Sequence, residues 1–61
     1  MTRQELIAAI LRCDREIAEC IENQARYPDC KIAACQGELD WRLAKEDYEA
    51  ELAKLLRKSA A

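Results

Sequence analysis

"YPDCKIAACQGELDW", residues 27–41, decides the fold of this 61-residue chain. The stretch holds the only proline, the only glycine and the only tryptophan, together with two of the four cysteines. Pro28 has no amide hydrogen to donate and disfavours helical geometry at Tyr27 before it, so a helix that arrives from the N-terminal side ends here. The stretch is therefore predicted to be the bend between two helices.

The residues before the bend are typical of an amphipathic helix over about 3–26. Thr2 and Glu5 fit a capping box in which Thr2 is the N-cap. No glycine or proline interrupts residues 2–26, and apolar residues recur at spacings of three and four, which places them on one side of a helix. These residues are Leu6, Ile10, Cys13, Ile17 and Cys20.

The residues after the bend favour a second helix over about 30–58. Good helix formers fill nearly all of 38–58. Three cations suit the last turn, where they meet the negative end of the helix dipole: Lys54, Arg57 and Lys58. Gly37 leaves two alternatives open, because glycine inside a helix costs about 1 kcal/mol relative to alanine. The helix is either unbroken or divided into a short turn at 29–36 and a helix at 38–58.

An unbroken second helix has apolar residues on two opposite sides. One stripe is Ile32, Cys35, Leu39, Leu43 and Ala50, and the other is Trp41, Ala44, Tyr48, Leu52 and Leu55. An antiparallel hairpin that turns at Pro28 pairs position i with about 56 − i, which sets the first stripe against the first helix.

We therefore expect the stripe from Trp41 to Leu55 to be left uncovered. Monomers rarely expose such a surface, and tryptophan and tyrosine are enriched among interface anchors. The stripe is predicted to bind a second copy or a different protein. A break at Gly37 would instead fold it inward as part of the core.

The predicted fold class is all-α: an antiparallel two-helix hairpin that forms a single domain over residues 1–61. One core in a chain of this length rarely supplies more than about 3–5 kcal/mol of stability. A second copy related by a two-fold axis would add the missing core, so we expect a homodimeric four-helix bundle.

The four cysteines do not have the spacing of a metal site. The gaps between them are six, nine and four residues, whereas four zinc ligands usually come as two pairs, each separated by two to four residues. Only Cys30 and Cys35 have such a gap, and on a helix they would point about 140° apart. Cys20 could form a disulfide with Cys30 or Cys35 across the bend if their Cα atoms lie within about 7 Å. Otherwise the cysteines are small apolar core residues. No metal or cofactor is predicted.

Asp14 lies among the apolar residues of the first helix, where an unpaired carboxylate would be costly. The expected register places Arg42 opposite, so an ion pair between Asp14 and Arg42 is predicted. The alternative places Asp14 at the rim of a dimer or partner interface.

Composition excludes several classes of function. Charged residues make up 36% of the chain and the net charge is −2, without a basic arm or an acidic tail. The chain has no histidine, the usual general base and commonest metal ligand, and no catalytic motif. No apolar run reaches the roughly 18–20 residues of a membrane span and no signal peptide is visible, so we expect a cytoplasmic protein that does not bind membranes.

The predicted arrangement resembles the Rop family of plasmid copy-control proteins, including the opening Met1-Thr2-Arg3-Gln4-Glu5. The resemblance implies a dimeric bundle that binds structured RNA through a basic outer face with an aromatic residue on the first helix. Here the outer face mixes glutamates and arginines and has no aromatic residue, which argues against nucleic acid. The residues are Arg12, Arg15, Glu16, Glu19, Glu22 and Arg26.

The size and helicity also resemble small proteins, encoded by phages or mobile elements, that bind and inhibit host proteins. We therefore predict a non-enzymatic protein-interaction module, a small adaptor or inhibitor that binds itself and a larger protein. The alternatives are a Rop-like RNA-binding regulator and a cysteine-based thiol or metal sensor.

Overall fold

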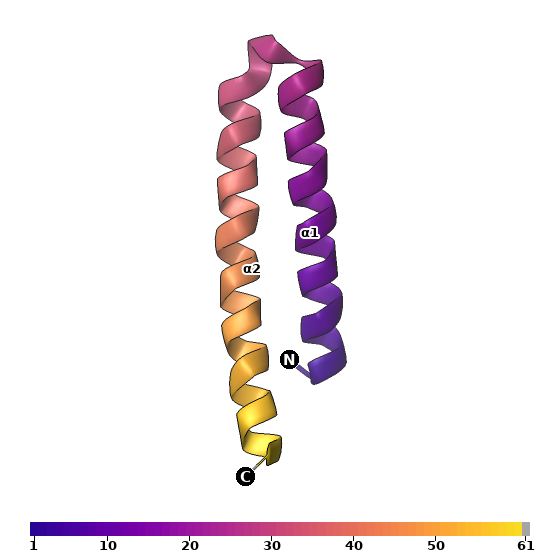
Figure 1. Cartoon of the computed structure of the whole chain (residues 1–61), viewed down its shortest axis with the longest axis vertical. Helices are drawn as coiled ribbons and strands as arrows, with labels where there is room; N and C mark the ends of the chain where they lie inside the picture. The colour runs from indigo at the N-terminus through magenta and orange to yellow at the C-terminus, as the bar shows by residue number, and fades with distance from the viewer. Residues whose placement is uncertain (61) are drawn as a thin grey trace.

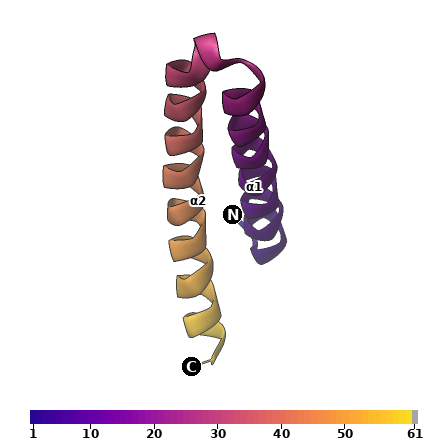
Figure 2. The ribbon, with the colours of Figure 1, turned by 45° about the horizontal axis from the view of Figure 1, so that its top comes forward.

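The chain is an antiparallel pair of long helices, which confirms the predicted all-α hairpin. The computed structural model describes residues 1–60 and the side chains of residues 1–58. Helix α1 runs from Arg3 to Arg26 and helix α2 from Lys31 to Ala60, joined by the single 3-10 turn η1 at Pro28–Cys30. The two helices lie side by side along their length in both views (Figure 1, Figure 2).

The N-terminus of α1 is closed by the predicted capping box. The Glu5 amide donates to the Thr2 hydroxyl at 3.2 Å, and the Thr2 amide donates to the Glu5 carboxylate at 2.9 Å. The hydrogen bond from the Thr2 backbone favours the ionised carboxylate, so the pKa of Glu5 lies below its usual range. Two amides that the helix leaves without an internal partner are thereby satisfied.

The bend lies where the sequence predicts it. The Tyr27 amide still donates to the Asn23 carbonyl at 2.8 Å, but Pro28 has no amide hydrogen with which to continue the helix. The Cys30 amide donates to the Tyr27 carbonyl at 3.0 Å, which closes the turn. The chain reverses within residues 27–30, and α2 begins directly after them.

Helix α2 continues through Gly37, so the alternative of a helix broken there is wrong. A Cβ atom added at Gly37 would lie 3.4 Å from the sulfur of Cys20 on α1. The glycine thus stands where the two helices approach each other closely. Its helical backbone needs no positive φ, so the role of the residue is to leave room rather than to allow an unusual conformation.

The hairpin buries few side chains. Among residues 1–58, Leu6, Cys13 and Ile17 are the buried hydrophobic residues, all on the side of α1 that faces α2. The molecule measures 50 × 15 × 14 Å and its radius of gyration is 14.3 Å, against about 10.5 Å for a globular domain of this length. Helix α2 extends beyond the start of α1 (Figure 1). Neither described helix combines the length and apolarity needed to cross a bilayer.

We expect Gly37→Ala to stabilise the protein. The added methyl group makes an ordinary contact with Cys20, and alanine gains about 1 kcal/mol over glycine inside a helix. For a chain of this size that corresponds to a rise of roughly 4–8 °C in the melting temperature. Circular dichroism during heating measures it. Gly37→Val is the matched control: its branched side chain cannot fit beside Cys20 and should lower the melting temperature. A decrease with alanine would show that the helices are closer than described.

Candidate interaction surfaces

Helix α2 faces α1 with the stripe from Trp41 to Leu55, which the sequence predicted to be uncovered. Trp41, Ala44, Tyr48, Leu52 and Leu55 are all half-buried against α1. The first stripe, which was expected to face α1, points outward: Ile32 is 89% exposed, and Leu39 and Leu43 are each 52% exposed. The helix is unbroken, as expected, but the prediction of which side of α2 faces α1 is wrong.

The register explains part of this difference. Lys45 lies opposite Asp14, and Gly37 lies against Cys20. These facing positions add to 59 and 57 respectively, rather than 56, because the whole segment 27–30 is used in the bend and α2 starts after it. At Asp14 the shift is three residues, which corresponds to a turn of α2 by about 60° relative to the expected facing side.

Side-chain size explains the rest. Gly37 allows close approach only if its own side of α2 faces α1. Trp41 lies on that side, four residues after Gly37, and Tyr48 follows seven residues after Trp41. They are accommodated because α1 presents small residues to them. A shallow groove of about 420 Å³ is lined by both aromatic rings together with Ala8, Ala9 and Cys13.

A cation lies over the ring of Trp41. The Arg12 guanidinium carbon lies 5.8 Å from the ring centroid, within the range of a cation–π contact that contributes about 0.5–1 kcal/mol at an exposed site. Trp41 is therefore held within the hairpin from two directions.

Asp14 does not pair with Arg42, so that prediction is wrong. The Asp14 carboxylate accepts from the Lys45 ammonium at 2.6 Å, and this hydrogen bond raises the pKa of Lys45 above its ordinary value. Arg42 instead donates to Glu38 one turn earlier in α2, at 2.7 Å. Together with a hydrogen bond from Gln24, at 2.7 Å, this contact lowers the pKa of Glu38.

The cysteines are free thiols. Cys13 is buried and Cys20 is half-buried beside Gly37, where burial raises the pKa of the thiol. Cys35 is exposed on the side of α2 that points away from α1, so the structure does not bring it to Cys20, and the disulfide that the sequence left possible is not formed. No group of three or more histidine, cysteine, aspartate or glutamate side chains gathers within the described part of the chain.

Two apolar surfaces remain open. The first, which we call the outer stripe, runs along the outside of α2 and consists of Ile32, Cys35, Leu39, Leu43 and Ala50. The second, which we call the flank, is a groove of about 410 Å³ between the helices, lined by Ile7, Ile10, Leu11, Glu49, Leu52, Ala53 and Leu56. Ile7, Leu11 and Leu56 in the flank are 40%, 61% and 43% exposed.

The flank continues toward the bend. Asp14 and Ile21 follow Ile7 at intervals of seven residues, so they lie on the same side of α1; Ile21 is 48% exposed. The Asp14–Lys45 ion pair therefore stands in the middle of this side. Sequence reasoning did not identify the flank as a surface, although the width of the apolar arc on α1 was the signal: a single helix can cover only part of it.

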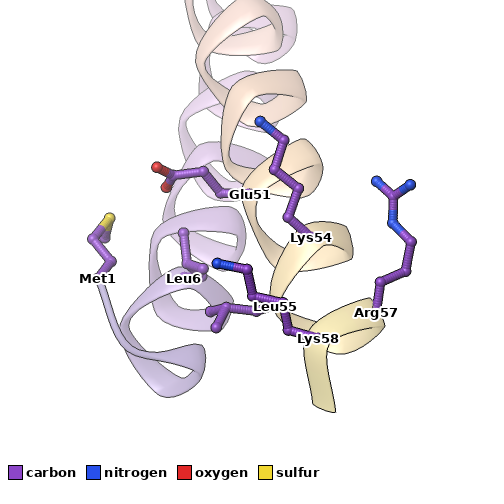
Figure 3. A pocket seen from close by; sticks show the side chains of 7 residues that line it. All are labelled: Met1, Leu6, Glu51, Lys54, Leu55, Arg57 and Lys58. Atoms are coloured by element: carbon purple, nitrogen blue, oxygen red, sulfur yellow. The ribbon is translucent and has the colours of Figure 1, made fainter. Parts of the chain in front are cut away.

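A third groove lies at the open end of the hairpin (Figure 3). It measures about 610 Å³, with Leu6 and Leu55 at its apolar base. Three cations lie around it, with Glu51 nearby: Lys54, Arg57 and Lys58. These cations are placed as expected for the last turns of a helix, where they interact favourably with its dipole. The charges of this groove therefore have a structural explanation.

Comparison of the chain with known protein families, with curated proteins and with solved structures finds no match.

The Asp14–Lys45 pair is tested by a double-mutant cycle. We expect the effects of Asp14→Asn and Lys45→Met on the free energy of unfolding to be non-additive, because each change removes the same contact. Urea unfolding of the two single variants and the double variant measures the coupling. The matched control combines Asp14→Asn with Arg42→Met, whose effects should add. Coupling to Arg42 instead of Lys45 would restore the register expected from the sequence.

Thiol labelling tests the positions of the cysteines. In the native protein at neutral pH, Cys30 should react rapidly with iodoacetamide because it is exposed, the half-buried Cys20 should react more slowly, and the buried Cys13 should react only after unfolding. Burial keeps the Cys20 thiol protonated, and the thiolate is the reactive form. Mass spectrometry of peptides over time gives the order. Labelling of Cys20 as fast as that of Cys30 would contradict the close packing at Gly37.

Proposed function

We propose that this chain is a non-enzymatic protein-interaction module, which associates with a second copy and binds a larger protein as a small adaptor or inhibitor in the cytoplasm. The observation that supports the proposal is the imbalance between buried and exposed apolar side chains. Three are buried, whereas large aliphatic residues stay open on the flank and along the outer stripe. Monomeric proteins rarely leave contiguous apolar surface of this kind uncovered.

The outer stripe suits insertion into a groove of another protein. Ile32, Leu39 and Leu43 are spaced by seven and four residues, which is the pattern of anchors along one side of a bound helix. Helix α2 is already formed, so little conformational entropy is lost on binding. By helical spacing, three acidic residues adjoin the stripe, Asp40, Glu46 and Asp47, against one cation, Arg42. The partner we propose therefore has an apolar groove with a basic rim.

The absence of enzymatic activity is part of the proposal. The sequence contains no histidine, and Asp14, the carboxylate that stands among apolar neighbours, is bound to Lys45. A general base must be free to accept a proton from a substrate. An ion pair of this kind supports a structural role for Asp14.

RNA binding has less support. Arg26 on the outer side of α1 pairs with Glu22 at 2.6 Å, and Arg12 lies over Trp41. Contacts with phosphates would have to replace these interactions. RNA binding would also weaken steeply as salt concentration rises, whereas apolar protein association would not.

Leu43→Glu tests the function of the outer stripe. The partner is first captured from a cell lysate on the immobilised protein, identified by mass spectrometry and purified. Its dissociation constant should then increase more than tenfold with the variant, because a charge is placed among the apolar anchors. Leu11→Glu on the flank is the matched control, because it also places a charge on an exposed leucine. Its dissociation constant for the same partner is measured in the same way. Equal affinities for wild type and Leu43→Glu would overturn the proposed role of the stripe.

A further inference from the structure

We infer that the flank binds a second copy of this chain in the antiparallel direction, with the two-fold axis passing beside the Asp14–Lys45 pair. The inference rests on the proposed function, because it assigns one of the two open surfaces to self-association. The two bends would then lie at opposite ends of a four-helix bundle, with α1 beside α1 and α2 beside α2 of the other copy. The outer stripe would stay free for a different protein.

The hairpin exposes more surface than a compact protein of its mass, and a second copy would cover the excess. The accessible surface of the chain is 4882 Å², whereas a folded monomer of 7.0 kDa is expected to expose about 4,040 Å². The excess of about 840 Å² is close to the roughly 800 Å² that each partner contributes to a standard protein interface. One contact of ordinary size would therefore bring the exposed area to that of a compact protein.

The apolar pattern of α1 is symmetric about Asp14. Ile7 and Ile21 lie seven residues before and after it, and Ile10 and Ala18 lie four residues before and after it. When two copies of α1 cross antiparallel at Asp14, Ile7 therefore meets Ile21 of the second copy, and Ile10 meets Ala18 of the second copy. Aliphatic residues face aliphatic residues on both sides of the axis, as a self-complementary interface requires.

Two charges of α2, one on either side of Lys45, are complementary under the same symmetry. Lys45 lies at the level of Asp14, so the axis passes α2 close to Lys45. Arg42 lies three residues before Lys45 and Glu49 four residues after it, on the same side of the helix. The two-fold axis thus brings Arg42 of one copy to Glu49 of the other, and it does so twice. Charges at an interface that meet opposite charges favour one orientation over others.

A parallel arrangement would lack these contacts. With both bends at the same end, α2 lies beside α1 of the second copy. At the observed register, Arg42 would then be level with Ile17 of the second copy and Glu49 with Ile10 of the second copy. Arg42 would keep only Glu38 of its own helix, and both Arg42 and Glu49 would be moved against aliphatic side chains that offer no opposite charge, which is costly. The antiparallel dimer is therefore the arrangement that the flank favours.

The first test is the oligomeric state of two leucine variants. Leu11 and Leu43 are both exposed in the single hairpin, at 61% and 52%, but Leu11 lies on the flank and Leu43 on the outer stripe. In analytical ultracentrifugation over a range of concentrations, wild type and Leu43→Glu should be dimers. Leu11→Glu should raise the dissociation constant more than tenfold. A monomeric wild-type protein, or a dimer that is lost with Leu43→Glu and kept with Leu11→Glu, would overturn the inference.

These variants also separate the two proposals. If the outer stripe binds no other protein, Leu43→Glu leaves partner binding unchanged while Leu11→Glu still dissociates the dimer. If the flank does not bind a second copy, Leu11→Glu leaves the oligomeric state unchanged, whether or not the outer stripe binds another protein.

The second test gives the direction of the copies and introduces cysteine, which is small and apolar, in place of a charge. In a parent protein with Cys30→Ser and Cys35→Ser, Ile7→Cys and Ile21→Cys are made as separate variants. A short bis-maleimide should link them into a covalent dimer when the two are mixed and allowed to exchange, but should link neither alone. The parent, which keeps Cys13 and Cys20, should give no covalent dimer. Linking of Ile7→Cys alone, or no linking in the mixture, would overturn the antiparallel arrangement.

Discussion

Two helices can each cover only one side of the other, and every notable feature of this molecule follows from that limit. Helix α1 has an apolar arc wider than one neighbour can bury, and α2 is apolar on two opposite sides. The close contact selects one side of each, with Leu6, Cys13 and Ile17 at its centre. The remaining apolar side chains are left in contact with water, where burial by a partner would be favourable at roughly 25 cal/mol per Å².

The side of α2 that turns inward is the one that carries Gly37. Helix packing distances are set by the side chains at the point of contact, and Gly37 lies beside Cys20 of α1. With α2 in this rotation, Trp41 and Tyr48 face the small residues of α1, and Leu39 and Leu43 are turned to the outside. The rotation of α2 thus decides which apolar side chains are available for recognition.

The sequence was sufficient to predict the two helices, the capping box and the bend, because each depends on local chemistry: the hydroxyl of Thr2, the missing amide hydrogen of Pro28 and the apolar period of α1. It was not sufficient to predict the rotation of α2. Both of its stripes are apolar, so periodicity does not distinguish them, and a register that is wrong by three residues gives Asp14 the wrong partner. Gly37 was considered only as a cost to the helix, whereas its contribution is to packing between helices. The flank was missed for a related reason, since its residues come from both helices and adjoin only once the register is known.

The Asp14–Lys45 pair illustrates how the same interaction changes its meaning with its surroundings. In the isolated hairpin both side chains are partly exposed, and an ion pair at such a surface adds little stability because water solvates each charge almost as well. Covered by a second copy, the pair would lose much of that solvation, and its attraction would serve mainly to offset the loss. Because both members belong to the same hairpin, the pair would stay intact in any docking register and would keep the interface from burying a lone charge. The selection of one arrangement would come from the residues on either side of the pair: the aliphatic pattern of α1 that is symmetric about Asp14, and Arg42, which meets Glu49 of the second copy only in the antiparallel dimer.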